Sequence, residues 1–215
     1  MMIMYLLCFV VIVVLAVCLL QNKNSHLVDL SKYPEIQTLI DNKDIIIQEL
    51  KQVMKLKLWA RWAEYDKINE TPIFSQMSHE EIIKHMNSNN SYLNEGSASW
   101  RIFGLMLSRQ IMNADLCPQT TAMLKKIPYI INAGFSCLEP GVSTSWHKGH
   151  NKNIYRCHLP LIVPNGNCAI KINGEIIKCK INNDFIFDDT NYHQAWNFTN
   201  ESRFVLIIDI SNYRN

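Results

Sequence analysis

The chain has 215 residues, of which 48% are hydrophobic and 19% charged, a size and composition that fit one folded domain with an appendage. Its formal net charge is only +2, and the sequence contains no motif typical of RNA or DNA binding. Composition and charge therefore argue against nucleic acid as a partner.

Residues 1–20 form an uncharged apolar run. A helix needs about 20 apolar residues to cross the hydrocarbon core of a bilayer, and this run meets that length. A cleaved signal peptide is the alternative, but it normally has a basic start and a shorter apolar stretch, whereas the first basic residue of this chain is Lys23. We therefore expect an uncleaved transmembrane anchor, followed by a polar tether over residues 21–33.

These features predict a single-pass membrane protein whose orientation stays open. Lys23 and Lys32 would favour the cytoplasmic side by the positive-inside tendency. Glycosylation sequons permit a lumenal or extracytoplasmic placement of the domain after the anchor, which is the placement we expect. Four sequons occur, and they begin at Asn69, Asn89, Asn197 and Asn200.

Residues 34–96 are expected to form a helical support. Over residues 33–67 apolar side chains recur at steps of three and four, as on one face of a helix. Ser78 and Glu81 have the form of a capping box, which predicts a further short helix. That helix carries two histidines, which we expect at the surface rather than on a metal: His79 and His85.

The chain changes character after about Pro128, where short β-rich segments alternate with Gly, Pro, Asn and Asp. Such spacing favours a sandwich or barrel, so residues 97–215 are expected to form a mainly β domain. The dipeptide Asn173-Gly174 predicts a tight hairpin, and counting outward from it places Cys168 opposite Cys179. The sequence leaves open whether these cysteines form a disulfide or fill strand positions as thiols.

Three histidines and two arginines of the β-rich half are candidates for chemistry. Strand alternation places Arg156 and His158 on the same side of a sheet. An unpaired arginine inside a barrel is costly, and a bound dicarboxylate would offset that cost through charge-assisted hydrogen bonds. Imidazoles suit divalent iron, although each histidine alone also fits a structural role. The five candidates are His147, Arg156, His158, His193 and Arg203.

Landmarks that run in order along residues 97–212 resemble the aspartyl/asparaginyl β-hydroxylase family. The resemblance implies a double-stranded β-helix, a jelly-roll or cupin-like barrel, and an Fe(II)- and 2-oxoglutarate-dependent dioxygenase that uses O2 to hydroxylate a C–H bond. The landmarks are Ala98–Phe103, Cys117–Thr120, Phe135–Gly141, His147–Gly149, Arg156–Leu161, Phe187–Trp196 and Arg203–Asp209.

The same resemblance assigns roles to individual residues. It implies two iron ligands, two residues on the far carboxylate of 2-oxoglutarate and two residues at its iron-chelating end. In that order these are His147 and His193, Arg203 and Ser136, and Arg156 and His158.

One position departs from the wider class of such enzymes, in which a carboxylate two residues after the first histidine also binds iron. This chain has Gly149 there, and the resemblance implies that water fills the position. His150 is the local competitor for the metal and is expected to be a loop residue. Asp188 and Asp189 are expected in a turn, with orientation of His193 or completion of the coordination sphere as the alternative.

Trp146 and Trp196 flank the two expected ligands, and we expect them to be wall and packing residues rather than substrate readers. The resemblance implies the β-carbon of Asp or Asn in a protein or peptide as the substrate, with a lipid acyl chain or a free amino acid as the alternative. A catalytically silent, membrane-tethered binding module is the non-enzymatic alternative, and the presence of His147, His193 and Arg203 favours catalysis over it.

Overall fold

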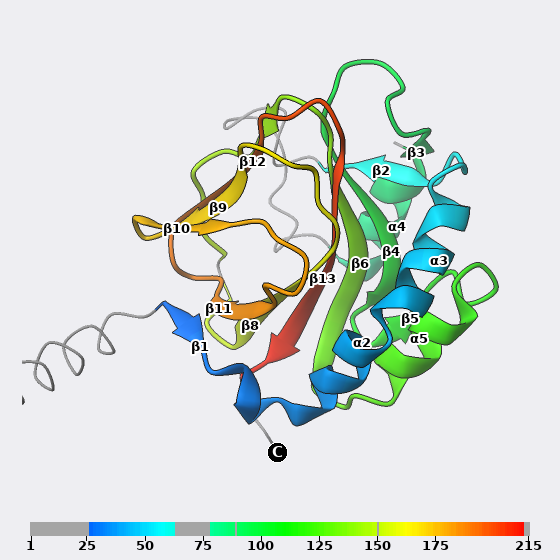
Figure 1. Cartoon of the computed structure of the whole chain (residues 1–215). Helices are drawn as coiled ribbons and strands as arrows, with labels where there is room; N and C mark the ends of the chain where they lie inside the picture. The colour runs from blue at the N-terminus through cyan, green and yellow to red at the C-terminus, as the bar shows by residue number, and fades with distance from the viewer. Residues whose placement is uncertain (1–25, 63–77, 89, 150, 213–215) are drawn as a thin grey trace, which may run out of the picture.

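A computed structural model describes residues 26–62, 78–88, 90–149 and 151–212 of the chain. Two antiparallel β-sheets lie face to face, and helices cover the outer face of the larger sheet (Figure 1). The predicted mainly β domain with supporting N-terminal helices is therefore confirmed.

Within the described residues, the larger sheet has nine strands and the smaller sheet has four. In spatial order the larger sheet consists of β1 (Leu27–Val28), β11 (Phe185–Asp188), β8 (Ile154–Ile162), β13 (Arg203–Ser211), β6 (Ile130–Leu138), β4 (Trp100–Leu107), β2 (Trp59–Arg61) and β3 (Asn90–Ser91), with β5 (Gln110–Ile111) beside β4. The smaller sheet consists of β10 (Glu175–Lys178), β9 (Cys168–Ile172), β12 (His193–Asn197) and β7 (Val142–Ser143).

Strand alternation separates two cores. On β13 the side chains of Phe204, Leu206 and Ile208 join the core beneath the helices. The intervening residues, among them Arg203 and Ile207, face the smaller sheet, where a second apolar cluster lies between the sheets. Each fully buried large apolar side chain stabilises the fold by about 1.5–3 kcal/mol, so the strand register is strongly determined. The polar residues of alternate positions are therefore directed between the two sheets.

The helical layer consists of short elements: the 3₁₀ turns η1 (Leu30–Lys32) and η2 (Pro34–Ile36), and the helices α2 (Gln37–Asp41), α3 (Lys43–Val53), α4 (His79–Ser88) and α5 (Pro118–Lys125). In α3, Ile46, Leu50 and Val53 form the buried stripe. Buried Glu49 on the same helix accepts hydrogen bonds from the N–H groups of Gln119 and Thr120, at 2.8 and 2.9 Å. This carboxylate from α3 caps the N-terminus of α5, whose own cap residue contributes no side-chain hydrogen bond.

The predicted capping box is confirmed at the start of α4. The Ser78 N–H donates to the Glu81 carboxylate at 2.7 Å, and the Glu81 N–H donates back to the Ser78 hydroxyl at 3.2 Å. Helix α4 carries both His79 and His85, as the sequence predicts.

The prediction of a helical pattern up to residue 67 is wrong over residues 54–62. Residues Trp59–Arg61 form strand β2 instead, because exposed lysines alternate with partly buried leucines just before it, which is the period of a strand. The Trp59 ring lies in the core, with its centroid 5.7 Å from that of Phe103 and 5.9 Å from that of Phe204. Residues 63–67 lie outside the described part of the chain.

The expected membrane anchor, residues 1–20, lies outside the described residues. Among the helices that the structure describes, none has the length and apolar character needed to cross a membrane. The end of the expected tether differs from a free linker, because Leu27 and Val28 form β1 and pair with Phe187 and Ile186 of β11. The folded domain therefore begins before the expected boundary at residue 34.

The predicted hairpin joins β9 and β10. Asn173 and Gly174 form the turn with φ angles of 43° and 101°, the left-handed conformations that a tight hairpin turn requires. The Cys179 N–H donates to the Cys168 carbonyl at 2.9 Å, so the two cysteines lie opposite one another as predicted, and both are free thiols.

The structure distinguishes among the sequons. Asn197 is fully buried, and its amide nitrogen donates to the carbonyls of Leu138 and Glu201, at 2.8 Å each. A glycan on Asn197 is therefore incompatible with the folded domain. Asn200 is exposed, and Asn69 and Asn89 lie outside the described residues.

Candidate functional site

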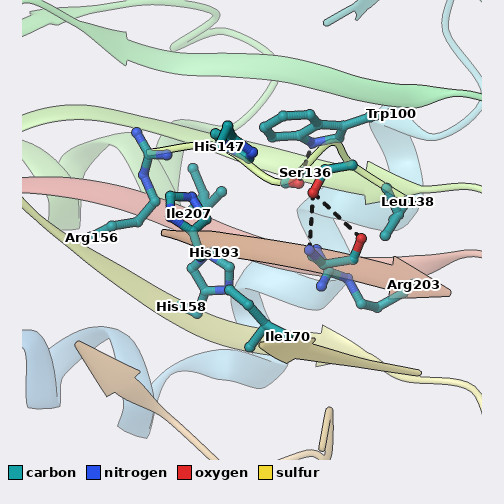
Figure 2. A pocket seen from close by; sticks show the side chains of 12 residues that line it. Trp100, Ser136, Leu138, His147, Arg156, His158, Ile170, His193, Arg203 and Ile207 are labelled. Atoms are coloured by element: carbon teal, nitrogen blue, oxygen red, sulfur yellow. Dashed lines mark hydrogen bonds between the residues drawn. The ribbon is translucent and has the colours of Figure 1, made fainter. Parts of the chain in front are cut away.

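A cavity lies between the two sheets, and all six site residues predicted from the sequence line it (Figure 2). It contains about 330 Å³ of empty space, part of which is open to solvent. Thr144 and apolar side chains, among them Ile170 and Ile207, form the rest of its wall. The six predicted residues are Ser136, His147, Arg156, His158, His193 and Arg203.

His147 and His193 are held side by side by the backbone. Each residue's N–H donates to the other's carbonyl, at 3.1 and 2.7 Å, and the ring centroids are 4.3 Å apart. The Nδ1 atoms of His147 and His193 lie 2.8 Å from the carbonyls of Ser145 and Asn191, respectively. Because a carbonyl only accepts, Nδ1 carries the proton in each ring and Nε2 keeps a free lone pair.

These two lone pairs fit a metal ion. Burial, together with the nearby His147 and Arg156, lowers the pKa of His193 to about 3, so the imidazole is neutral. The Nε2 atom of His147 is buried and has no hydrogen-bond partner among the described residues. Two adjacent imidazoles that each keep an Nε2 lone pair are suitable ligands for a divalent transition metal.

Asp189 lies against this pair and against Gly149. One Asp189 carboxylate oxygen is 2.9 Å from Nη1 of Arg156 and 3.5 Å from Nε2 of His193. A Cβ atom on residue 149 would lie 1.9 Å from the other Asp189 carboxylate oxygen. The space beside Gly149, where the wider class has its third ligand, is therefore next to a carboxylate from the turn that follows β11.

The expectation of a turn role is confirmed for Asp188, whose carboxylate accepts from the N–H and hydroxyl of Thr190 at 2.9 and 2.8 Å. Asp189 also lies in this turn, as expected, and its buried carboxylate is in addition directed towards His193. In the described part of the chain, no three His, Cys, Asp or Glu side chains converge in a way that could hold a metal. The candidate protein ligands for a metal are therefore the two histidines, with the Asp189 carboxylate beside them.

Arg156 was expected to need a bound dicarboxylate as its partner, but the protein itself supplies two carboxylates. Its Nε donates to Asp209 at 2.9 Å, in addition to its ion pair with Asp189 at 2.9 Å. Asp209 is the register partner of Arg156 on the neighbouring strand β13. The charge of Arg156 is therefore met by two carboxylates, and it positions Asp189 beside His193.

Arg203 matches the expectation of a buried arginine without a carboxylate partner among the described residues. It is only 2% exposed and is therefore not a surface arginine. Its Nη1 donates to the Cys179 sulfur at 3.7 Å, and its Nε has no hydrogen-bond partner among the described residues. A buried guanidinium in this state favours an anion, and a carboxylate matches its fork of donors.

Ser136 lies on the neighbouring strand β6 with its hydroxyl oriented by Trp100, whose Nε1 donates to it at 2.9 Å. The hydroxyl can still donate its own proton to a bound anion. His158 is a neutral group between the arginines, because burial, Arg203 and Arg156 hold its pKa well below its usual range.

A profile of the family described as aspartyl/asparaginyl beta-hydroxylase matches residues 41–212, which is most of the chain. The chain belongs to the aspartyl/asparaginyl β-hydroxylase family. The predicted resemblance is thereby confirmed.

Two curated relatives of this aspartyl/asparaginyl β-hydroxylase family member are hydroxylases. The ornithine lipid ester-linked acyl 2-hydroxylase of Rhizobium tropici is 37% identical over 114 residues, which are 51% of this chain and 41% of that protein. The human aspartyl/asparaginyl beta-hydroxylase is 28% identical over 106 residues, which are 46% of this chain and 14% of that protein. The chain thus spans less than half the length of either relative.

Solved structures give more distant matches. An oxidoreductase of the 2OG-Fe(II) oxygenase family from Burkholderia pseudomallei matches at a TM-score of 0.43 and 10% identity, over 55% of this chain and 70% of that one. A predicted oxalate decarboxylase from Thermotoga maritima matches at a TM-score of 0.37 and 18% identity, over 55% of this chain and 86% of that one.

The tryptophans of this family member are placed differently from the expectation. Trp146 is 46% exposed and stacks on Tyr192, with ring centroids 6.0 Å apart, and Trp196 donates to Asn167. Neither lines the cavity; Trp100 does, and the sequence analysis assigned it no role. His150, the expected loop residue beside the ligands, lies outside the described residues.

Proposed function

We propose that the chain is an Fe(II)- and 2-oxoglutarate-dependent hydroxylase, held at a membrane by its first twenty residues. The observation that carries the proposal is that one cavity contains both a pair of potential metal ligands and a buried arginine suited to a carboxylate. Two adjacent histidines, each with its Nδ1 held by a backbone carbonyl, lie on one side, and the buried Arg203 lies on the other (Figure 2). Membership of a family whose named relatives are hydroxylases supports it.

His147 and His193 would hold the iron through Nε2. When bound, iron and 2-oxoglutarate supply the activation of O2 that hydroxylates a C–H bond, with succinate and CO2 as the co-products. The protein contributes orientation and the exclusion of water. Asp189, held by Arg156 and 3.5 Å from Nε2 of His193, would accept a hydrogen bond from a water beside the ligand pair, the second-sphere role of such carboxylates.

Arg203 and the Ser136 hydroxyl would bind the far carboxylate of 2-oxoglutarate. An arginine–carboxylate pair in a desolvated cavity is a strong, directional contact, and the Trp100 hydrogen bond fixes the Ser136 oxygen. Neutral His158 would meet the chelating end of the co-substrate without adding charge. Arg156 would act at the same end chiefly through Asp189, since two carboxylates already occupy its guanidinium.

Two substrate classes follow from the relatives. The identity to the ornithine lipid acyl hydroxylase is higher, 37% against 28% for the human enzyme, and it covers more of that protein. This comparison favours a lipid acyl chain over the β-carbon of Asp or Asn, which was the first expectation from the sequence. An apolar anchor at residues 1–20 would also keep the domain close to lipids.

The test is succinate formation by the full chain with Fe(II), 2-oxoglutarate and O2, in the presence of an aminolipid or of an Asp- or Asn-containing peptide. We expect one class to raise succinate formation and to gain one oxygen atom, as measured by mass spectrometry. His147→Ala and His193→Ala variants are the controls. Binding of 2-oxoglutarate with no succinate from any substrate would instead support the silent binding module.

A further inference from the structure

Cys168 and Cys179 form a thiol pair between strand β9 and the end of β10. The hairpin turn sets their register, and the Cys179 N–H donates to the Cys168 carbonyl at 2.9 Å. Their side chains also hydrogen-bond to each other. Cys168 is buried and Cys179 is half-buried, so the second thiol is the one that small reagents reach.

The pair touches the arginine of the site. Nη1 of Arg203 lies 3.7 Å from the Cys179 sulfur, and the described residues place no carboxylate on this guanidinium. Hydrogen bonds from Cys168 and Arg203, together with the charge of Arg203, lower the pKa of Cys179 to about 6 against the effect of burial. The pKa of Cys168 is raised, so Cys168 remains a thiol and donates to its neighbour.

The other described cysteines have the opposite environment. Cys117 and Cys137 are fully buried, and burial raises the pKa of each to about 12. Burial also raises the pKa of Cys157. Since the thiolate is the reactive form of cysteine, these three thiols are inert by comparison and serve as internal controls.

We propose that Cys168 and Cys179 are a covalent modification site that shares Arg203 with the co-substrate. The Cys179 thiolate and a co-substrate carboxylate compete for the charge of the same guanidinium. Binding of the co-substrate therefore disfavours the Cys179 thiolate, and formation of the thiolate weakens co-substrate binding by the same factor, as linkage requires. The shared use of Arg203 rests on the proposed function, whereas the reactivity of Cys179 does not.

Oxidation by a peroxide gives a cross-strand disulfide. The Cys179 thiolate attacks one oxygen of hydrogen peroxide, the O–O bond breaks, and hydroxide leaves, so that Cys179 becomes a sulfenic acid. The Cys168 sulfur then attacks the Cys179 sulfur, the S–S bond forms and the S–O bond breaks. The second hydroxide takes the Cys168 proton, and the first takes one from solvent. Two thiol groups are oxidised by two electrons in total, and the peroxide is reduced to two waters.

The first test measures the reactivity of the reduced full chain towards iodoacetamide at pH 7, with peptide mapping by mass spectrometry. We expect Cys179 to react at least about 100-fold faster than Cys117 or Cys137, because a far larger fraction of it is thiolate. Cys168→Ser should slow the reaction several-fold by weakening the hydrogen bond that Cys179 accepts. Equal rates for Cys179 and Cys117 would overturn the proposal.

The second test adds 2-oxoglutarate with Zn(II) as a redox-inert metal and repeats the alkylation. We expect bound 2-oxoglutarate to slow alkylation of Cys179 several-fold, and hydrogen peroxide to join Cys168 to Cys179 only in its absence. If 2-oxoglutarate binds and the rate is unchanged, the shared use of Arg203 is wrong and the proposed function stands. If the reduced chain does not bind 2-oxoglutarate, both fall, and the first test still decides the reactivity of Cys179.

Discussion

Replacing Gly149 by alanine tests the arrangement of Asp189 beside the histidine pair. The added Cβ would lie 1.9 Å from one Asp189 carboxylate oxygen and 2.7 Å from its Cγ. Neither distance can be tolerated, so the carboxylate must move. Because that carboxylate is 2.9 Å from Arg156 and 3.5 Å from His193, both contacts are lost or weakened.

The cost follows from overpacking at a buried site, about 1–3 kcal/mol. In a domain of this size each kcal/mol lowers the melting temperature by about 2–4 °C, so Gly149→Ala should lower it by about 2–12 °C. Thermal unfolding of the metal-free full chain, followed by circular dichroism, measures this directly.

A double-mutant cycle isolates the cause. In an Asp189→Ala background the side chain that the new Cβ meets is gone, and only the Asp189 backbone oxygen at 3.2 Å remains close. Arg156 keeps Asp209 as a partner in that background, which preserves the fold. We expect Gly149→Ala to cost at least about 1 kcal/mol less there, within the range of coupled neighbours. An equal cost in both backgrounds would refute the reasoning.

Three further predictions concern buried charges. Arg203→Ala should weaken the binding of 2-oxoglutarate by about 2–5 kcal/mol, or about 30-fold to several thousand-fold, and Arg203→Lys should recover only part of the affinity. Anaerobic calorimetry on the iron-loaded chain measures both, and unchanged affinity would remove Arg203 from the site. Glu139→Ala should destabilise the domain by about 3–5 kcal/mol in urea unfolding, because it leaves buried Arg101 without the carboxylate 2.8 Å from its Nε; a loss below about 1 kcal/mol would contradict this. Glu49→Ala should cost about 1–3 kcal/mol by removing the cap of α5, whereas the exposed Glu80 replaced by Ala should cost almost nothing.

Strand alternation explains most of what could be predicted from the sequence. The two-residue spacing of Arg156 and His158 directs both side chains between the sheets, as expected. The same period accounts for Trp146, which precedes inward-facing His147 and therefore points away from the cavity. The Asn173-Gly174 turn set the register of its hairpin because only left-handed conformations close so short a loop.

Contacts between distant strands could not be predicted in the same way. Arg156 meets Asp209 because β8 and β13 pair in a register that includes an irregularity near Phe204 and Val205, and no local pattern specifies it. Asp189 reads as a turn residue from its neighbours, and only the fold places it beside Gly149 and His193. The contact of Cys179 with Arg203 likewise depends on how the two sheets face each other.

The most direct test of the central claim is anaerobic titration of 2-oxoglutarate into the full chain with and without Fe(II). The account predicts that binding requires iron, and that it is lost when His147 and His193 are both replaced by alanine in a protein that stays folded. Binding of 2-oxoglutarate that is equally tight without iron, or in the double variant, would contradict it.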